Sequence, residues 1–239
     1  MATSPATNPT TVPQNALVNY LISMARTVEV TVSAALDALL ERNPRLASQV
    51  FLAEPGINEM EILIDEHAVR LLSRSGLAET DVRLVVATIK INNDLERMGD
   101  LAVNIAQRVV SLAQMPSESV PEELVPMTAA VRAMMHKSLG ALTARNPDLA
   151  GEVLASDEVV DRYRDQIFDR LLRTLAVAPA QAPAGLQFAL AARHLERIAD
   201  HATNIAEDVL FWLRGLEVRH GRGRTLNLRG APAEAEPAV

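Results

Sequence analysis

The sequence predicts an all-α protein built as two tandem three-helix bundles related by internal duplication. Residues 95–106, LERMGDLAVNIA, return as LERIADHATNIA at residues 195–206, with eight identical positions. A second signature, Arg-Asn-Pro at residues 42–44, returns at residues 145–147. Strand signals are scarce, because aromatic residues make up only 3% of the chain and no Asn-Gly hairpin turn occurs. Two spaced repeats with helical periodicity therefore favour duplicated helical bundles.

The first half reads as three helices. Residues 16–42 carry apolar side chains at helical spacing, at positions 17, 21, 24, 28, 32, 36, 39 and 40. This helix ends at Asn43, because a residue that precedes proline is driven out of the helical region. Pro44 suits the first turn of a second helix that runs to Ser75, with a candidate break near Pro55-Gly56. The third helix starts near residues 79–81 and ends before Pro116.

The second half repeats this plan with a small deletion. The Arg-Asn-Pro signatures are 103 residues apart, whereas the twelve-residue repeats are 100 apart. We therefore expect the second half to be three residues shorter in the turn between its second and third helices. The predicted organisation is a disordered tail at residues 1–14, bundles at 15–115 and 121–217, a linker between them, and a disordered tail at 218–239.

Composition excludes several classes of protein. The net charge of −7 argues against nucleic acid as a partner, since no dominant basic surface is available for phosphates. The absence of cysteine excludes disulfides and thiol catalysis and fits a reducing cytoplasm. Residues 174–192 are uncharged, but their prolines and glycine predict a helix–turn–helix junction rather than a membrane span. With no phosphate loop, nucleophile elbow or Ser/His/Asp spacing, we expect a soluble protein that is not an enzyme.

Each copy of the twelve-residue repeat places an acidic stripe opposite its apolar seam. Four further carboxylates recur at the same i,i+4 spacing on the middle helices. The candidate residues are Glu96 and Asp100, Glu196 and Asp200, Glu61 and Asp65, and Asp161 and Asp165. Like charges at this spacing cost a helix a few tenths of a kcal/mol. Arg162, Arg164 or a bound cation could offset that repulsion, and carboxylates without cysteine favour hard ions. A solvated face and a metal site both stay open.

The histidines form no metal-binding motif. We interpret His201 as an ordinary surface residue, because its counterpart in the first repeat is Leu101. His194 and its counterpart Asp94 are expected to face solvent. Phe211 and Trp212 are interpreted as core or dimer-contact residues near the end of the last helix.

The duplicated pattern L-E-R-[MI]-[GA]-D-x-A-x-N-I-A resembles the PhoU family, the accessory and regulatory proteins of phosphate-specific transport, over residues 15–217. This resemblance implies a cytoplasmic all-helical protein, commonly a homodimer. It implies contact with the ATPase subunit of the phosphate ABC transporter and with a sensor histidine kinase. The protein would repress the phosphate-starvation response when phosphate is plentiful, reaching the membrane only through these partners. The resemblance also implies metal clusters on the eight carboxylates above, with Fe, Mn, Mg or Zn as candidate ions.

The sequence departs from the family pattern at three places, one of which is an N-terminal helix without the more charged opening of the family. Gln107 stands where the second copy has Glu207, and Ala199 replaces the usual glycine. Both put equal metal occupancy of the two halves in doubt. The alternative function is a metal store or a carboxylate-site metalloenzyme built on a bundle. In bundle enzymes of that kind the carboxylates project into the core, whereas here they are expected to point outward, which favours a regulator.

Overall fold

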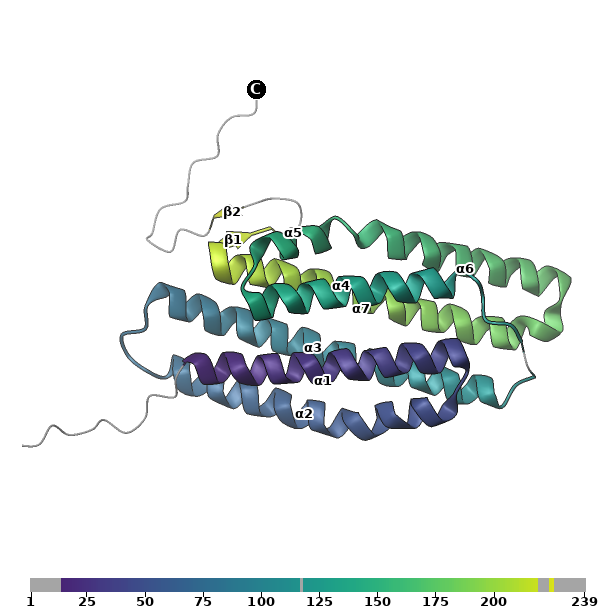
Figure 1. The fold of residues 1–239 in the computed structure, drawn as a ribbon, viewed down its shortest axis with the longest axis horizontal. Coiled ribbons are helices and arrows are strands. Elements are labelled where there is room, and N and C mark those ends of the chain that lie inside the picture. The colour runs from purple at the N-terminus through teal and green to yellow at the C-terminus, as the bar shows by residue number, and fades with distance from the viewer. Residues whose placement is uncertain (1–13, 117, 219–223, 226–239) are drawn as a thin grey trace, which may run out of the picture.

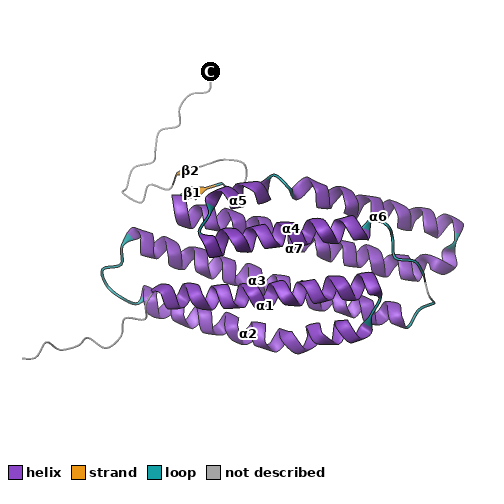
Figure 2. Cartoon of the chain, viewed as in Figure 1, coloured by secondary structure: helices purple, strands orange, loops and turns teal. Residues whose placement is uncertain are grey.

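A computed structural model describes residues 14–116, 118–218 and 224–225, and it shows two helical units lying side by side (Figures 1 and 2). The first unit holds α1 (Gln14–Glu41), α2 (Pro44–Leu72) and α3 (Glu79–Ala113). The second holds α4 (Leu124–Ala144), α5 (Pro147–Leu154), α6 (Asp157–Val177), the 3-10 turn η1 (Pro179–Gln181) and α7 (Ala182–Arg214). The predicted all-α fold of two duplicated bundles is therefore confirmed. Most of the two predicted tails lies outside the described residues, namely residues 1–13, 219–223 and 226–239. The disorder expected for these tails therefore stays a prediction.

The seams read from the sequence form the core of each unit. All the apolar positions assigned to α1 are buried except Leu40, which is half-buried. In the repeat, the five seam residues of α3 and their five copies in α7 are fully buried, at positions 95, 98, 102, 105 and 109 and at 195, 198, 202, 205 and 209. Burial of these side chains away from water is the main term that drives the helices together.

The middle helix is continuous in the first unit and interrupted in the second. Pro55 lies inside α2 without ending it, so the break considered near Pro55-Gly56 is wrong. Proline removes one backbone hydrogen bond, but buried Val50 and Ile57 anchor α2 on both sides of it. In the second unit α5 stops at Leu154 and α6 starts at Asp157, where an Ala-Ser pair replaces the Leu-Ala of the first unit. This interruption gives seven α-helices among the described residues where six were expected.

The Arg-Asn-Pro signatures shape equivalent turns in the two units. Asn43 and Asn146 cap α2 and α5, since each side chain accepts a hydrogen bond from the backbone N–H two residues on. The preceding arginines, Arg42 and Arg145, both take the left-handed conformation with φ of 50°. Arg42 then donates to the backbone oxygen of Glu118 at 2.7 Å and so ties the linker between α3 and α4 to the first unit.

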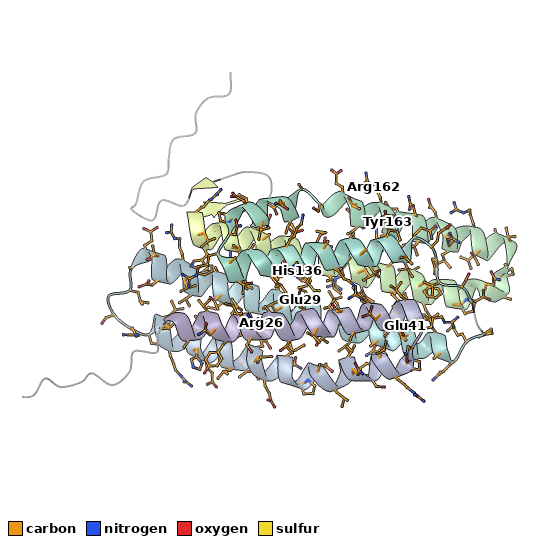
Figure 3. The ribbon with its side chains drawn as sticks, viewed as in Figure 1. Arg26, Glu29, Glu41, His136, Arg162 and Tyr163 are labelled. Carbon is orange, nitrogen blue, oxygen red and sulfur yellow. The ribbon has the colours of Figure 1, made fainter. Side chains whose placement is uncertain are left out.

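The two units meet along α3 and α7, and also along α1 and α4. At the second contact Glu29 and His136 face each other between α1 and α4, with 3.0 Å between the Glu29 carboxylate and His136 Nδ1 (Figure 3). The uncharged stretch at residues 174–192 forms the junction of α6, η1 and α7, as predicted. Two-residue strands β1 (Leu216–Glu217) and β2 (Arg224–Thr225) pair antiparallel after α7. No helix within the described ranges is long and apolar enough to cross a membrane.

Gly99 lets α2 approach α3 closely in the first unit. A Cβ at Gly99 would lie 3.2 Å from Cδ1 of Ile57 and 3.4 Å from its Cγ2, which is tighter than ordinary contact. The equivalent positions of the second unit hold Ala199 and Val160, both buried. An added methyl on one helix is therefore matched by a lost methyl on the other, which preserves the packed volume.

This compensation predicts energetic coupling between the two positions. Ile57→Val should lower the free energy of unfolding by about 0.5–1.5 kcal/mol in the native chain. In the Gly99→Ala background the cost should fall by about 0.5 kcal/mol or more, because the new methyl fills the space. Urea unfolding of the two single variants and the double variant measures the coupling. Ile64→Val, on the same helix and fully buried, is the additive control; additivity at Ile57 as well would refute the compensation.

Candidate functional site

The carboxylates singled out in the sequence lie on two surfaces, one on each unit. We call Glu61, Asp65, Glu96 and Asp100, on α2 and α3, the first acidic face. We call Asp161, Asp165, Glu196 and Asp200, on α6 and α7, the second acidic face. Glu96 and Glu196 are each only 21% exposed, whereas Asp65, Asp165 and Asp200 are exposed, so each face is partly covered and partly open to solvent.

The first acidic face carries charge that its own side chains do not neutralise fully. Partial burial, Asp100 and Glu61 together raise the pKa of Glu96, and only Arg97 acts against them. Arg97 lies 3.6 Å from the Glu96 carboxylate and is more than half exposed, so solvent weakens this pair. Carboxylates such as those of Glu61, Glu96 and Asp100 are the kind of ligand that a hard cation prefers.

Asn92 joins α2 to α3 beneath the first acidic face. Its side chain is 1% exposed, and its amide nitrogen donates to the backbone oxygen of Glu61 and to the Asp65 carboxylate, each at 3.0 Å. Asn92 was not among the candidate residues that the sequence pattern indicated. Its counterpart in the second copy is Ala192, and a polar side chain at one copy of a buried apolar position was the available signal. Asn92 therefore fixes where Asp65 points.

The second acidic face is organised around Arg164. Its guanidinium lies 3.0 Å from Asp161, 2.9 Å from Asp165 and 2.8 Å from Glu196 across on α7. Partial burial lowers the pKa of Arg164, but the hydrogen bond to Asp165 and the surrounding carboxylates outweigh it and hold the pKa above its ordinary value. Arg162, the other arginine considered for this role, is exposed at the outer edge of α6 (Figure 3). An open hollow beside the face is lined by Arg164, Asp165, Phe168, Arg193, Glu196, Arg197 and Asp200.

The eight carboxylates are thus divided between two acidic faces of different chemistry. Among the residues that the structure describes, no group of three or more His, Asp or Glu side chains is arranged to hold a metal ion. Metal binding at Glu61, Asp65, Glu96, Asp100, Asp161, Asp165, Glu196 and Asp200 stays a prediction. The first acidic face retains the donors for it, whereas the second is already occupied by a guanidinium.

The contact between the units corrects three expectations. Asp94, expected to face solvent, is buried, and His201, expected at the surface, is only 16% exposed. The Asp94 carboxylate lies 2.8 Å from His201 Nδ1 and accepts a hydrogen bond from Asn204 at 3.3 Å. His194 is half-buried rather than solvent-facing; burial and then Arg108, Arg197 and Arg193 lower its pKa. Each of these residues lies beside the apolar seam of its own helix and is covered by the other unit. The pattern of a single helix does not show this contact.

Comparison with known proteins gives consistent matches. The PhoU domain model matches residues 21–109 and again residues 124–209. The phosphate-specific transport system accessory protein PhoU homolog of Pseudomonas putida is 38% identical over 208 residues, covering 85% of this chain and 81% of the relative. The homolog from Pseudomonas aeruginosa is 37% identical over 187 residues, with 78% and 77% covered.

Solved structures give the same result. The crystal structure of PhoU from Pseudomonas aeruginosa superposes with a TM-score of 0.80 at 35% identity, covering 84% of this chain and 97% of that one. The phosphate transport system regulatory protein PhoU from Streptococcus pneumoniae superposes with a TM-score of 0.76 at 25% identity, covering 90% and 98%.

The raised pKa of Glu96 predicts a pH-dependent penalty. A carboxyl whose pKa is higher in the folded state destabilises the fold once it is ionised, and the penalty is absent at pH values below its unfolded pKa. Glu96→Gln should therefore raise the melting temperature at pH 7 in the presence of a chelator, and the gain should shrink as pH falls toward 4.5. Glu59→Gln, on the exposed side of α2, is the charge-matched control. An equal gain at all pH values would argue against this origin.

The metal hypothesis makes a separate prediction for the first acidic face. A cation bound only to the native state adds about 2.7 kcal/mol at 100 times its dissociation constant. Manganese, iron or magnesium should then raise the melting temperature of the native chain, and Asp100→Asn should abolish the rise. Asp169→Asn, an exposed acid on α6, should leave it intact. Melting curves that do not change between chelator and any of these metals would mean that this face binds none of them.

Proposed function

The chain belongs to the PhoU family, and from that premise we propose that it regulates phosphate uptake and phosphate-starvation signalling by contact with other proteins. The observation that carries the proposal is the PhoU domain occurring twice over residues 21–109 and 124–209. Relatives named as accessory proteins of phosphate-specific transport are covered over about four-fifths of their length. The similarity therefore extends over both halves, and not over one bundle alone.

The proposed partners are the ATPase subunit of the phosphate ABC transporter and a sensor histidine kinase. Contact with them would hold the starvation response off while phosphate is plentiful. In this proposal the chain works in the cytoplasm as a homodimer and meets the membrane only through these partners.

Exposed apolar side chains on the outer helices support a function by contact. Val69 on α2 and Leu172 on α6 stand at equivalent positions and are 61% and 63% exposed. Leu72 and Leu175, three residues further along each helix, are also exposed. Both halves thus present an apolar pair to solvent, and such pairs suit protein–protein contact better than solvation.

A catalytic function has less support. A metal store or a carboxylate-site enzyme would need converging ligands, and no group of three His, Asp or Glu side chains in the described ranges is so arranged. Because the relatives are named as accessory proteins, we propose an accessory protein without catalytic activity.

Deletion of the gene followed by complementation tests the proposal. In rich phosphate the deletion strain should express phosphate-starvation genes or take up phosphate without restraint, because the repressing contact is lost. The native chain should restore repression. Val69→Ser/Leu72→Ser and Leu172→Ser/Leu175→Ser should each restore it less well, whereas Leu52→Ser, a highly exposed apolar residue elsewhere on α2, should behave as native.

Reporter expression and phosphate uptake are the readouts, with circular dichroism of each purified variant to verify folding. Unchanged expression and uptake in the deletion strain would contradict a regulatory function in this pathway. Full complementation by both double variants would show that repression does not need the two apolar pairs, and it would not contradict the regulatory function. Affinity capture with purified transporter ATPase subunit and kinase then tests each partner separately.

A further inference from the structure

We propose that the guanidinium of Arg164 is the resident cation of the second acidic face, and that this face consequently takes no metal ion. The two halves of the duplicated fold would then differ in how they offset the repulsion between their carboxylates. The second half neutralises its carboxylates with a side chain of its own. In the first half Glu96 has the exposed Arg97 at 3.6 Å and Asp65 has the amide of Asn92, and neither partner bridges several carboxylates.

The middle helices of the two units align at one constant sequence offset. Four buried positions of α2 recur as buried positions of α5 and α6 at a constant offset of 103 residues: Ala47 and Ala150, Val50 and Val153, Ile57 and Val160, and Ile64 and Ile167. At this offset Arg164 stands where the first unit has Glu61, and Phe168 stands where it has Asp65. The pairs Glu61/Asp65 and Asp161/Asp165, which look alike in sequence, are thus not structurally equivalent.

The guanidinium of Arg164 donates hydrogen bonds to three carboxylates. Its Nη1 donates to Asp161 on its own helix at 3.0 Å and to Glu196 on α7 at 2.8 Å. Its Nε and Nη2 both donate to one oxygen of Asp165, at 3.0 and 2.9 Å. One cation therefore bridges three carboxylates on two helices, which is the arrangement a bound metal ion would otherwise provide. The side chain is 26% exposed, so solvent screens these charge-assisted bonds only in part.

A metal ion does not fit beside this guanidinium. Arginine keeps its proton at any pH at which the protein is folded, so a metal ion would meet a fixed positive charge. Arg193 and Arg197 line the same hollow and add to that charge. Phe168 offers no ligand atom at the position where the first unit supplies the Asp65 carboxylate. Both substitutions therefore act in the same direction, against metal binding.

The experiment uses the full chain, stripped with chelator, in a Glu96→Gln/Asp100→Asn background that weakens the first acidic face. Manganese bound per chain is measured by equilibrium dialysis and elemental analysis. The background chain should bind no manganese. Adding Arg164→Glu and Phe168→Asp, which installs the residues of the first unit, should give one manganese per chain. Arg162→Glu with Phe168→Asp, an equal charge change at an exposed arginine of α6, should give none.

A stability readout tests the same assignment without metal. Arg164→Gln should lower the melting temperature in chelator by about 2–4 °C, because three carboxylates lose their counter-ion. Arg162→Gln should leave it within about 1 °C of the native value.

Two results would overturn the inference. One is manganese bound to the background chain and lost on Asp200→Asn, which would place a metal on the second acidic face beside Arg164. The other is a folded Arg164→Glu/Phe168→Asp chain, verified by circular dichroism, that binds no manganese, which would mean that Arg164 is not what excludes the metal.

Discussion

α3 and α7 pack antiparallel along most of their length, and every other α-helix is placed against one of these two. Lys90 lies opposite Asp208, Asp94 opposite His201, and Arg108 opposite Gln187. α1 and α2 pack on α3, while α4, α5 and α6 pack on α7. Each of the two central helices is therefore covered by its own bundle and by the other unit. This double coverage explains why so few positions of the repeat are fully exposed.

The central contact also buries charge, and the two halves contribute to it unequally. Asp208 is 1% exposed, and its carboxylate lies 3.2 Å from the ammonium of Lys90. The same ammonium lies 5.0 Å from the centre of the Phe211 ring. The equivalent position of α3 is Arg108, which donates to Gln187 instead. A buried carboxylate destabilises a fold unless it is paired, so these partners are required by the packing. The duplication thus kept its apolar seam and diversified the polar residues beside it.

The same divergence appears on the acidic faces. Between Glu61 and Arg164 the sign of the charge reverses at a single equivalent position, and between Asp65 and Phe168 a charge is lost. The first acidic face raises the pKa of Glu96 through burial and neighbouring carboxylates, whereas the second holds Arg164 between three of them. Similar i,i+4 spacing on the two units therefore does not give similar chemistry. The chemistry of each face depends on which side chains stand beside its carboxylates on the two packed helices.

The sequence by itself determined the all-α fold, the duplication and the core, but not the interruption between α5 and α6. Apolar spacing and the Arg-Asn-Pro turns are local signals, because they depend on helix period and on proline sterics within a few residues. Only the tertiary structure decided which polar residues are buried and which carboxylates have a counter-ion. Asp94, Asn92 and His201 look like surface residues on one helix, and contact with a second helix buries the first two and covers most of His201. Such contacts join residues about 30 to 110 positions apart, and the periodicity of a single helix carries no information about them.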